Sequence, residues 1–431
     1  MTPILLCGQS RSGGTALMKL LASSDAVFVD RDDPYEKRYL THFAKLAELL
    51  ARGEPPDPFS DRELLDFNDC AFGGFPWSYS KAYEGSGWPP NRADWLRVFW
   101  QGFTSLANRS NPAARYYAEK APPWLGGVVR EASPAEVVYL FRDLRDVYVS
   151  ARTDYEYARM HNAGKTSELA QLLSHEFIEN YEHYAADRAA GNAFLMRYED
   201  SVGDAEETVG RIEQRFDLRL NWNHGSQNLS RHAASTSSDA SVERWRKESL
   251  DEHAHRTFLR CVGRELRDLG YTVGDLPDPV FEWNFSRECM AGAAFEQSSD
   301  GRIQLESGRA RVEIHGPRYW LALPQADFDA ASVDHIWLCV AQGPGNVCAL
   351  DWSPGQPFSD GAYFHVEHQP SADSRVLDFP LYMHPEWRGR IRGLRLHLFN
   401  LYQKGFERRL SLATECRGTG YVRWIRGFKL G

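Results

Sequence analysis

The chain has 431 residues, of which 42% are hydrophobic and 25% charged, and these fractions exclude a disordered chain and fit a folded protein of two or three domains. Its 50 basic and 59 acidic side chains give a formal net charge of −9, which argues against a protein that coats nucleic acid through a general positive field. Any anionic ligand must therefore meet a local group of basic residues.

The N-terminal segment shows no basic region followed by a long apolar stretch, so we expect no secretory signal, and no apolar run reaches membrane-spanning length. The seven cysteines lack the paired spacing of a disulfide framework or a zinc site. We therefore expect a cytoplasmic protein that needs no metal and has no membrane span.

The first half of the chain alternates predicted strands and helices. Residues 3–7 are an apolar run, 8–14 a glycine-containing loop and 15–22 the start of a helix, and the apolar run 137–141 is typical of a parallel strand covered on both faces. The remaining predicted elements are a short strand at 194–197 and helices at 35–51, 92–107, 167–190, 204–216 and 251–269. This order predicts an α/β domain with a mainly parallel sheet and ligands at the carboxyl ends of its strands.

The pattern changes near residue 276, after which helical periodicity nearly vanishes. Short alternating segments separated by Gly, Pro, Ser and Asp then follow, at 311–315, 335–340, 362–366, 393–398 and 420–425. They predict an all-β sandwich or jelly roll. We therefore expect two domains, residues 1–275 and residues 280–431.

Residues 8–15, Gly-Gln-Ser-Arg-Ser-Gly-Gly-Thr, form a candidate phosphate loop, because successive backbone N–H groups and the start of the next helix can face an anion. Compared with the loop of nucleotide hydrolases, the Lys is replaced by Gly14. A kinase or ATPase would need a substitute cation. Within the loop, Arg11 is the residue that could supply this cation.

Five segments, in the same order along the chain, resemble the sulfotransferases that use 3′-phosphoadenosine-5′-phosphosulfate (PAPS). Gly14 replaces a Thr of the family's phosphosulfate loop, and Leu144 replaces the Pro of its 3′-phosphate segment. The matching segments are Ser10–Thr15, Glu119–Pro122, Tyr139–Ser150, Arg197–Asp200 and Ser241–Leu250.

The resemblance implies a role for most residues of the donor site. It places the 5′-phosphosulfate on Arg11, the backbone amides from Ser12 through Gly13 and Gly14 to Thr15, and the Thr15 hydroxyl. It places the 3′-phosphate, which distinguishes PAPS from ATP, on Arg142 and Ser150. It further implies that Arg244 closes over the nucleotide, that Trp245 packs on the adenine and that Lys120 neutralises the leaving group, which departs as PAP.

The acceptor, a hydroxyl or an amine, needs a base to take its proton. In this family the base is a His or a carboxylate, and crowded carboxylates in residues 30–36 can raise one another's pKa. We expect Glu36 or Asp33 in this role, followed by Glu119. Alternatively, Asp32 or Asp33 caps a helix that begins at Pro34. His161 and His232 are the histidine alternatives.

The predicted β domain is rich in tryptophan. Exposed rings can stack on sugars, although most of these rings are expected to fill the core, Trp424 among them by alternation. The segment Trp387–Ile391 loosely resembles β-sandwich modules attached to bacterial glycan enzymes. We therefore expect a saccharide or glycoconjugate acceptor. The tryptophans concerned are Trp320, Trp337, Trp352, Trp387 and Trp424.

Two other functions stay open at this point. A divergent P-loop kinase would ignore a 3′-phosphate and require Mg²⁺. A non-catalytic glycan-binding protein would have no need of Arg11, Lys120, Arg142 and Ser150, all of which are present.

Overall fold

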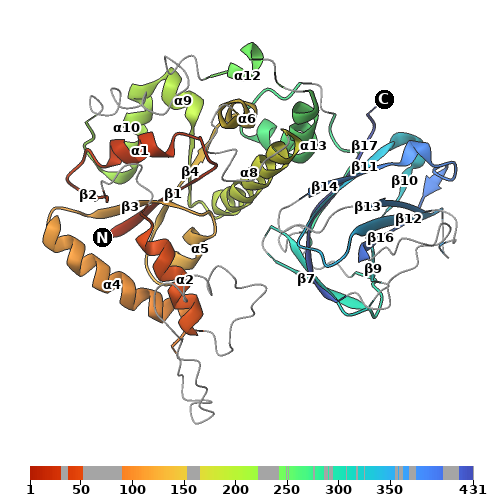
Figure 1. The fold of residues 1–431 in the computed structure, drawn as a ribbon, viewed down its shortest axis with the longest axis horizontal. Helices are drawn as coiled ribbons and strands as arrows, with labels where there is room; N and C mark the ends of the chain where they lie inside the picture. The colour runs from red at the N-terminus through yellow and green to blue at the C-terminus, as the bar shows by residue number, and fades with distance from the viewer. Residues whose placement is uncertain are drawn as a thin grey trace, which may run out of the picture. The chain divides into compact units, whose positions relative to one another are not determined.

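The computed structural model describes residues 1–30, 37–51, 90–152, 166–221, 242–248, 250, 252–274, 277–285, 290, 295–306, 308–316, 319–324, 326–354, 358, 363–367, 375–400 and 417–430. The chain divides into two compact units (Figure 1), which we describe separately. Unit 1 comprises residues 1–154 and 179–249, and unit 2 comprises residues 155–178 and 250–431. Helix α8 (Thr166–Ala189) contributes residues to both. The predicted boundary between residues 275 and 280 stays a prediction.

Unit 1 contains a parallel sheet, which in the described residues has five strands in the order β2-β3-β1-β4-β5. The strands are β1 (Thr2–Gly8), β2 (Val27–Phe28), β3 (Tyr116–Ala121), β4 (Glu136–Phe141) and β5 (Ala193–Arg197). The helices are α1 (Gly14–Leu21), α2 (Tyr39–Ala51), α4 (Arg92–Ser110), α5 (Leu125–Arg130), α6 (Leu144–Arg152), α9 (Tyr198–Gly203), α10 (Ala205–Phe216) and α12 (Arg244–Lys247). The α/β architecture predicted from the sequence is confirmed.

Helices cover both faces of this sheet (Figure 1). On the face of α1 and α10, Leu17 and Ile212 pack with Leu6 of β1 and Val138 of β4 in one buried cluster. The opposite face carries α2, α4 and α5. Burial on both faces explains why the runs at β1 and β4 are apolar throughout, with no alternation.

Strand β3 was not predicted, because its sequence contains Glu119 and Lys120. The strand nevertheless lies inside the sheet, between β2 and β1. Successive side chains of a strand point to opposite faces. Each of the two charged side chains therefore meets a different partner, described below.

Unit 2 contains a sandwich of two antiparallel sheets, as the sequence predicts. The larger has the order β14-β11-β17-β8-β7 with β6 also paired to β17, and the smaller has the order β13-β12-β16-β9. Inward side chains such as Leu338, Leu350, Leu396 and Ile425 fill the space between the sheets. The strands are β6 (Phe281–Asn284), β7 (Gly301–Leu305), β8 (Ala310–Ile314), β9 (Trp320–Ala322), β11 (His335–Ala341), β12 (Val347–Ser353), β13 (Tyr363–Glu367), β14 (Arg375–Pro380), β16 (Gly393–Asn400) and β17 (Gly418–Phe428), with a separate pair β10 (Phe328–Asp329) and β15 (Arg390–Ile391).

The expectation that Trp424 fills the sandwich core is wrong. Trp424 is buried, but the register of β17 against β11 shifts between Cys339, opposite Trp424, and Val340, opposite Val422. This bulge gives β17 an extra residue, so that Val422 and Ile425 both join the core and Trp424 does not. Strict alternation across a bulge assigns a side chain to the wrong face.

The outer face of the larger sheet is covered by α13 (Glu252–Asp268), which also belongs to unit 2. Arg426 of β17 donates to Glu265 of α13 at 2.7 Å and to Glu282 of β6 at 2.9 Å. The Arg260 guanidinium of α13 lies 5.8 Å from the centre of the Trp337 ring. These contacts explain why Trp337 is buried outside the core.

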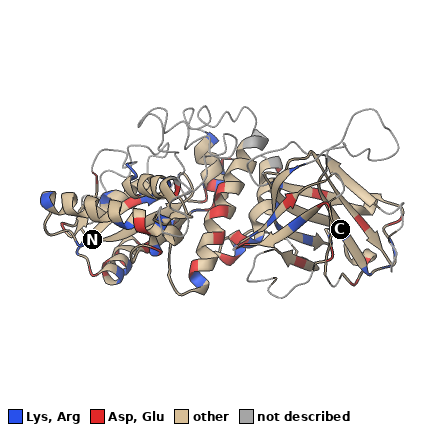
Figure 2. Ribbon diagram, turned by 90° about the horizontal axis from the view of Figure 1, so that it is seen from below, with Lys and Arg blue, Asp and Glu red and all other residues tan. Residues whose placement is uncertain are grey.

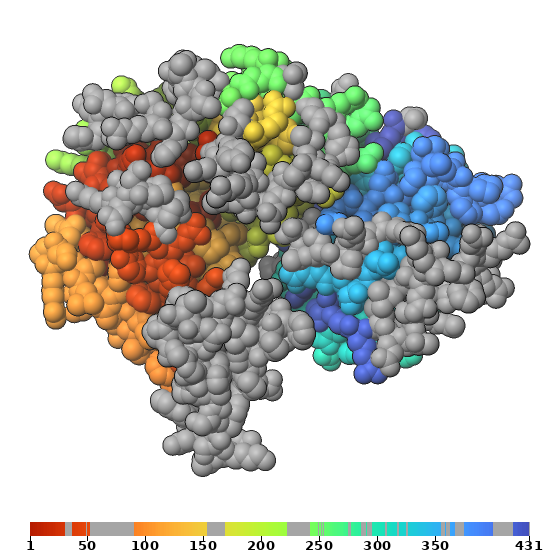
Figure 3. All heavy atoms as spheres, in the orientation of Figure 1, coloured from red at the N-terminus to blue at the C-terminus, as the bar shows by residue number. Residues whose placement is uncertain are grey.

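Basic and acidic residues are interspersed along the described helices and strands (Figure 2), in keeping with the 50 basic and 59 acidic residues of the sequence. Helix α4, orange in Figure 3, lies at the surface and exposes Val98 and Leu106. None of the described helices combines the length and the apolar composition that a membrane crossing needs.

Candidate functional site

The candidate site is built on the loop between β1 and α1, at the carboxyl end of the central strand. Arg11 and Gly13 have left-handed backbone conformations, with φ of 67° and 95°, and Ser12 N–H donates to the Gln9 carbonyl at 3.3 Å. Left-handed backbone in a residue other than glycine is uncommon and costs free energy. The loop is therefore held in a specific, strained shape, with the first amides of α1 at its end.

Tyr198 closes one side of this loop. A Cβ added to Gly13 would lie 2.9 Å from the Tyr198 ring, so only glycine fits there without movement. The Arg142 guanidinium stacks on the same ring, 4.4 Å from its centre. Tyr198 lies in the matching segment Arg197–Asp200, but no role was predicted for it.

Lys120 reaches the loop from the neighbouring strand. Its ammonium donates to the Thr15 hydroxyl at 2.8 Å. A Cβ added to Gly14 would lie 3.7 Å from the Lys120 Cε atom, in ordinary contact. Lys120 thus supplies, from β3, the cation that the loop lacks at Gly14.

Arg11, Arg142 and Ser150 meet at the other end of the loop. Arg11 Nε donates to Ser150 Oγ at 3.1 Å, and Arg142 Nη1 donates to the Arg11 carbonyl at 3.0 Å. Gln9, a residue without a predicted role, donates from Nε2 to the Arg142 carbonyl at 2.7 Å. The structure therefore joins the loop to both ends of the segment from Arg142 to Ser150.

Arg244 and Trp245 lie in a short segment packed against α6. The Arg244 guanidinium forms an ion pair with Glu248 of the same segment. One face of the Trp245 ring is occupied by the Arg145 guanidinium, 3.9 Å from the ring centre. The Arg246 guanidinium also lies over this ring, 4.8 Å from its centre. An adenine ring would therefore have to use the edge of Trp245 or displace one of the two arginines.

Glu119 is the one predicted base candidate that the structure describes, and its surroundings do not suit that role. Its carboxylate is fully buried and accepts hydrogen bonds from the N–H groups of Leu40 and Thr41, the Thr41 hydroxyl and the Tyr117 hydroxyl, at 2.6–3.0 Å. Burial raises the pKa of Glu119. The carboxylate anchors the start of α2, on the other face of β3 from Lys120.

The remaining base candidates, Glu36, Asp33, His161 and His232, lie outside the described residues. Within the described part of the chain, no three His, Cys, Asp or Glu side chains gather in a way that could hold a metal ion. The described site thus consists of anion-binding groups: backbone amides, two arginines, a lysine and two hydroxyls.

A family model described as the sulfotransferase family matches residues 3–223, just over half of the chain. The chain belongs to the sulfotransferase family. The match spans the loop, β3, β4, α6 and the segment Arg197–Asp200, and it ends before Arg244 and Trp245. No curated protein matches the chain.

Solved structures similar to each part of the chain share little sequence with it. The sulfotransferase domain of the olefin synthase from Synechococcus PCC 7002 is 14% identical, with 59% of this chain and 92% of that chain covered and a TM-score of 0.36. A sulfotransferase from Mycobacterium avium is 15% identical, with coverages of 63% and 77% and a TM-score of 0.34. A low-affinity xylan-binding module from Roseburia intestinalis is 11% identical, with coverages of 34% and 94% and a TM-score of 0.22.

Proposed function

We propose that this sulfotransferase uses PAPS as its donor and transfers the sulfonate group to a hydroxyl or amine of a saccharide or glycoconjugate. In this proposal residues 1–275 form the transferase domain and residues 280–431 an accessory domain. The observation that carries the proposal is the pairing of cations with hydroxyls at two ends of one loop, Lys120 with Thr15 and Arg11 with Ser150.

The residues present fit a nucleotide with phosphates at two positions. At one end, the amides of Ser12 to Thr15 and the Lys120 ammonium would hold the 5′-phosphosulfate, because the helix start and the ammonium both favour an anion. At the other end, Arg142 and Ser150 would hold the 3′-phosphate, for which Arg offers a planar fork of donors. Arg11 lies between the two groups, since its side chain contacts Ser150 and its backbone belongs to the loop.

Sulfonate transfer is an in-line displacement at sulfur. The acceptor oxygen or nitrogen bonds to sulfur, the bond from sulfur to the bridging oxygen breaks, and PAP leaves with the electron pair. Lys120 and the loop amides stabilise the negative charge on that oxygen, because donors already fixed in place need no reorganisation at the moment of reaction. A carboxylate, Asp33 or Glu36, takes the acceptor proton.

A saccharide acceptor is favoured by features of unit 2. Trp320 of β9 is partly exposed, and the Arg395 guanidinium of β16 lies 5.0 Å from its ring centre. An exposed ring beside hydrogen-bonding groups suits a sugar, which has apolar faces and a polar rim. The other four tryptophans singled out in the sequence are buried.

A cytoplasmic location is part of the same proposal. Cys7, Cys261, Cys339 and Cys348 are buried and form no disulfide, and burial raises the thiol pKa of Cys261 and Cys348 to about 12. Such thiols are chemically inert and suit a reducing compartment.

The test is transfer of ³⁵S from labelled PAPS to a panel of saccharides, glycolipids, peptides and phenols. We expect labelled product with at least one saccharide, and less of it at low PAPS concentration when Arg142→Ala replaces the wild type. Binding of PAP without transfer to any acceptor would instead favour a non-catalytic protein, and Mg²⁺-dependent ATP turnover would favour a kinase.

A further inference from the structure

Asp146 in the first turn of α6 is a buried carboxylate with an unusual set of partners. Its exposed fraction is 0%, and its Oδ1 atom accepts the Trp245 backbone N–H at 2.9 Å. The Glu243 backbone N–H also donates to this carboxylate. Asp146 thus binds two backbone amides of a segment almost a hundred residues further along the chain.

Arg145, the preceding residue, contacts the same segment through its side chain. Asp143 holds the Arg145 guanidinium by two hydrogen bonds, Nε to Oδ1 at 2.9 Å and Nη2 to Oδ2 at 2.6 Å. Asp143 is itself fixed, because its N–H donates to Glu199 at 2.8 Å. The oriented guanidinium then stacks on Trp245, 3.9 Å from the ring centre, a cation–π contact in a desolvated place.

The segment from residue 242 to 248 needs such support. Its helix, α12, has only four residues, and Glu243 before it has a left-handed backbone with φ of 53°. A single helical turn is not stable alone, and a left-handed conformation persists only where its surroundings impose it. The two amides and the ring held by α6 are the contacts that impose it.

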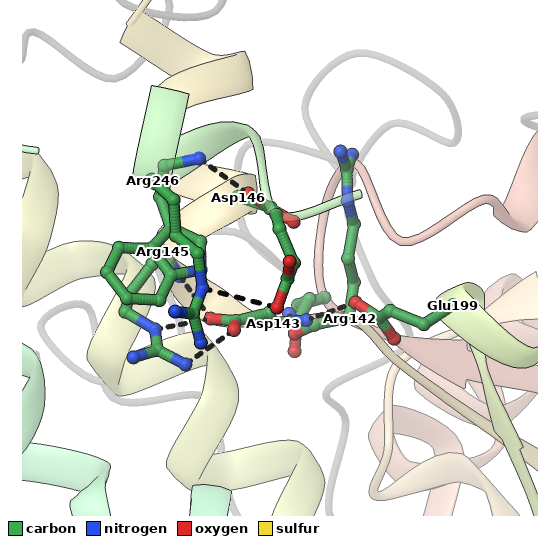
Figure 4. A network of polar contacts seen from close by, with 9 residues as sticks. Arg142, Asp143, Arg145, Asp146, Glu199 and Arg246 are labelled. Carbon is green, nitrogen blue, oxygen red and sulfur yellow. Dashed lines mark hydrogen bonds and ion pairs between the residues drawn. The ribbon is translucent and has the colours of Figure 1, made fainter. Parts of the chain in front are cut away.

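The groups proposed for the 3′-phosphate are Ser150, which lies in the same helix, and Arg142, which lies just before it. Asp146 and Ser150 are four residues apart in α6 and therefore share one face, and Arg142 lies close enough to Asp146 to stabilise its charge. In Figure 4 the Arg142 side chain points away from the pair of Arg145 and Asp143. The start of α6 thus presents Arg142 on one side and the contacts to residues 242–248 on the other.

We propose that Arg145 and Asp146 are positioning residues, which hold residues 242–248 against α6 so that Arg244 contacts the nucleotide bound at Arg142 and Ser150. This inference rests on the proposed use of PAPS. Neither residue touches the nucleotide. Both act through Arg244, whose own side chain is buried and paired with Glu248.

The arrangement at Asp146 costs stability, which favours a functional reason for it. Among the described residues, its Oδ2 atom has no hydrogen-bond partner. Burial raises the pKa of Asp146 to about 6. A buried carboxyl group with one oxygen unsatisfied is unfavourable, and such groups concentrate at functional sites.

The experiment compares PAP binding by calorimetry, without metal, in the full chain and its variants. Asp146→Ala removes the acceptor of both amides, and we expect PAP affinity to fall about tenfold or more, since hydrogen bonds to charged groups are the strong ones. Asp146→Asn keeps an oxygen acceptor and should stay within about threefold of wild type. Asp204→Ala is the matched control, because Asp204 caps α10 by accepting the Glu207 N–H at 2.8 Å and should leave PAP affinity unchanged.

A double-mutant cycle separates positioning from general damage. In the Arg244→Ala background, Asp146→Ala should lower PAP affinity little further, because both changes remove the contact between Arg244 and the nucleotide. In turnover, the KM for PAPS should rise while kcat at saturating PAPS stays within a few-fold. Should Asp146→Ala fail to fold, Arg145→Met gives the same comparison, since it removes the stacking cation and keeps an apolar side chain.

The outcomes are distinct. If the wild type does not bind PAP, the proposed function fails, whatever the variants do. If the wild type binds PAP and both Asp146→Ala and Arg145→Met bind it equally well, the positioning role is overturned. Full additivity with Arg244→Ala would overturn it as well, because the residues would then act independently of Arg244.

Discussion

The Lys120 ammonium lies 2.8 Å from the Thr15 hydroxyl, although the two residues are 105 positions apart in the chain. Lys120 comes from β3, and Thr15 lies in the first turn of α1. This contact places a cation beside Gly14, where nucleotide hydrolases have the lysine of the loop itself. The cation beside the loop therefore comes from Lys120 of strand β3.

Lys120→Met tests the role of this cation. We expect kcat for sulfonate transfer to fall about 100-fold or more, because losing one preorganised donor to the developing charge typically costs 10²–10³ in rate. PAP affinity should change only a few-fold. Lys429→Met, which removes an exposed lysine of unit 2 paired with Asp334, is the control and should keep full activity. A Lys120→Met enzyme with wild-type kcat would remove Lys120 from the mechanism.

Arg142→Ala tests the assignment of the 3′-phosphate. The variant should bind PAP about 10- to 100-fold more weakly, as expected for a lost hydrogen bond to a charged group. Its affinity for 5′-AMP, which lacks the 3′-phosphate, should be unchanged. Titration of both nucleotides into both proteins gives the comparison. Equal losses for PAP and 5′-AMP would show that Arg142 supports the loop and does not read the 3′-phosphate.

Alanine substitutions at the neighbouring Gly13 and Gly14 test whether PAP binding depends on the shape of the loop. Gly13→Ala places a Cβ 2.9 Å from the Tyr198 ring at a backbone φ of 95°, so we expect a loss of about 1–3 kcal/mol in stability and little PAP binding. Gly14→Ala meets only Lys120 and Leu140 side-chain atoms at 3.7–3.9 Å and should fold and bind PAP. Thermal unfolding and calorimetry measure both effects. Equal behaviour of the two variants would contradict the tight packing of Gly13.

Asp146 makes stability depend on pH in a specific direction. Burial, with a small contribution from Asp143, raises its pKa from 3.8 to about 6. The folded state then binds the proton more tightly than the unfolded state. The contribution of Asp146 to the free energy of unfolding is therefore fully present below about pH 4 and is lost as pH rises through about 6. Asp146→Asn does not titrate. The thermal midpoint of Asp146→Asn minus that of wild type should therefore increase from pH 4 to pH 7.5, by the equivalent of up to about 3 kcal/mol. A difference that is independent of pH would contradict the raised pKa.

The sequence predicts much of the fold, because its strongest signals are local. The apolar runs at β1 and β4 and the glycine loop between β1 and α1 were identifiable from pattern alone. Strand β3 was not, since Glu119 and Lys120 interrupt its apolar character. Their partners, the start of α2 and the loop, are far away in the chain.

The site was predictable only in part, for the same reason. The matching segments named Arg11, Lys120, Arg142 and Ser150, and the structure brings them to one loop. Tyr198 was not predicted, because a single aromatic residue after a strand gives no local signal of the arginine that stacks on it. The pairing of Asp146 with Trp245, and the bulge that turns Trp424 outward, depend on register and on distant contacts that no local pattern contains.

We propose that the loop and α6 together bind a nucleotide with phosphates at both the 5′ and the 3′ positions. Calorimetric titration of PAP, 5′-AMP and ATP into the wild-type chain, with EDTA in one series and Mg²⁺ in a second, tests this proposal directly. We expect PAP to bind most tightly, the loss of the 3′-phosphate to weaken binding, and ATP to be unable to displace PAP. Binding of ATP that requires Mg²⁺, with no heat from PAP, would contradict a site for a 3′-phosphorylated nucleotide.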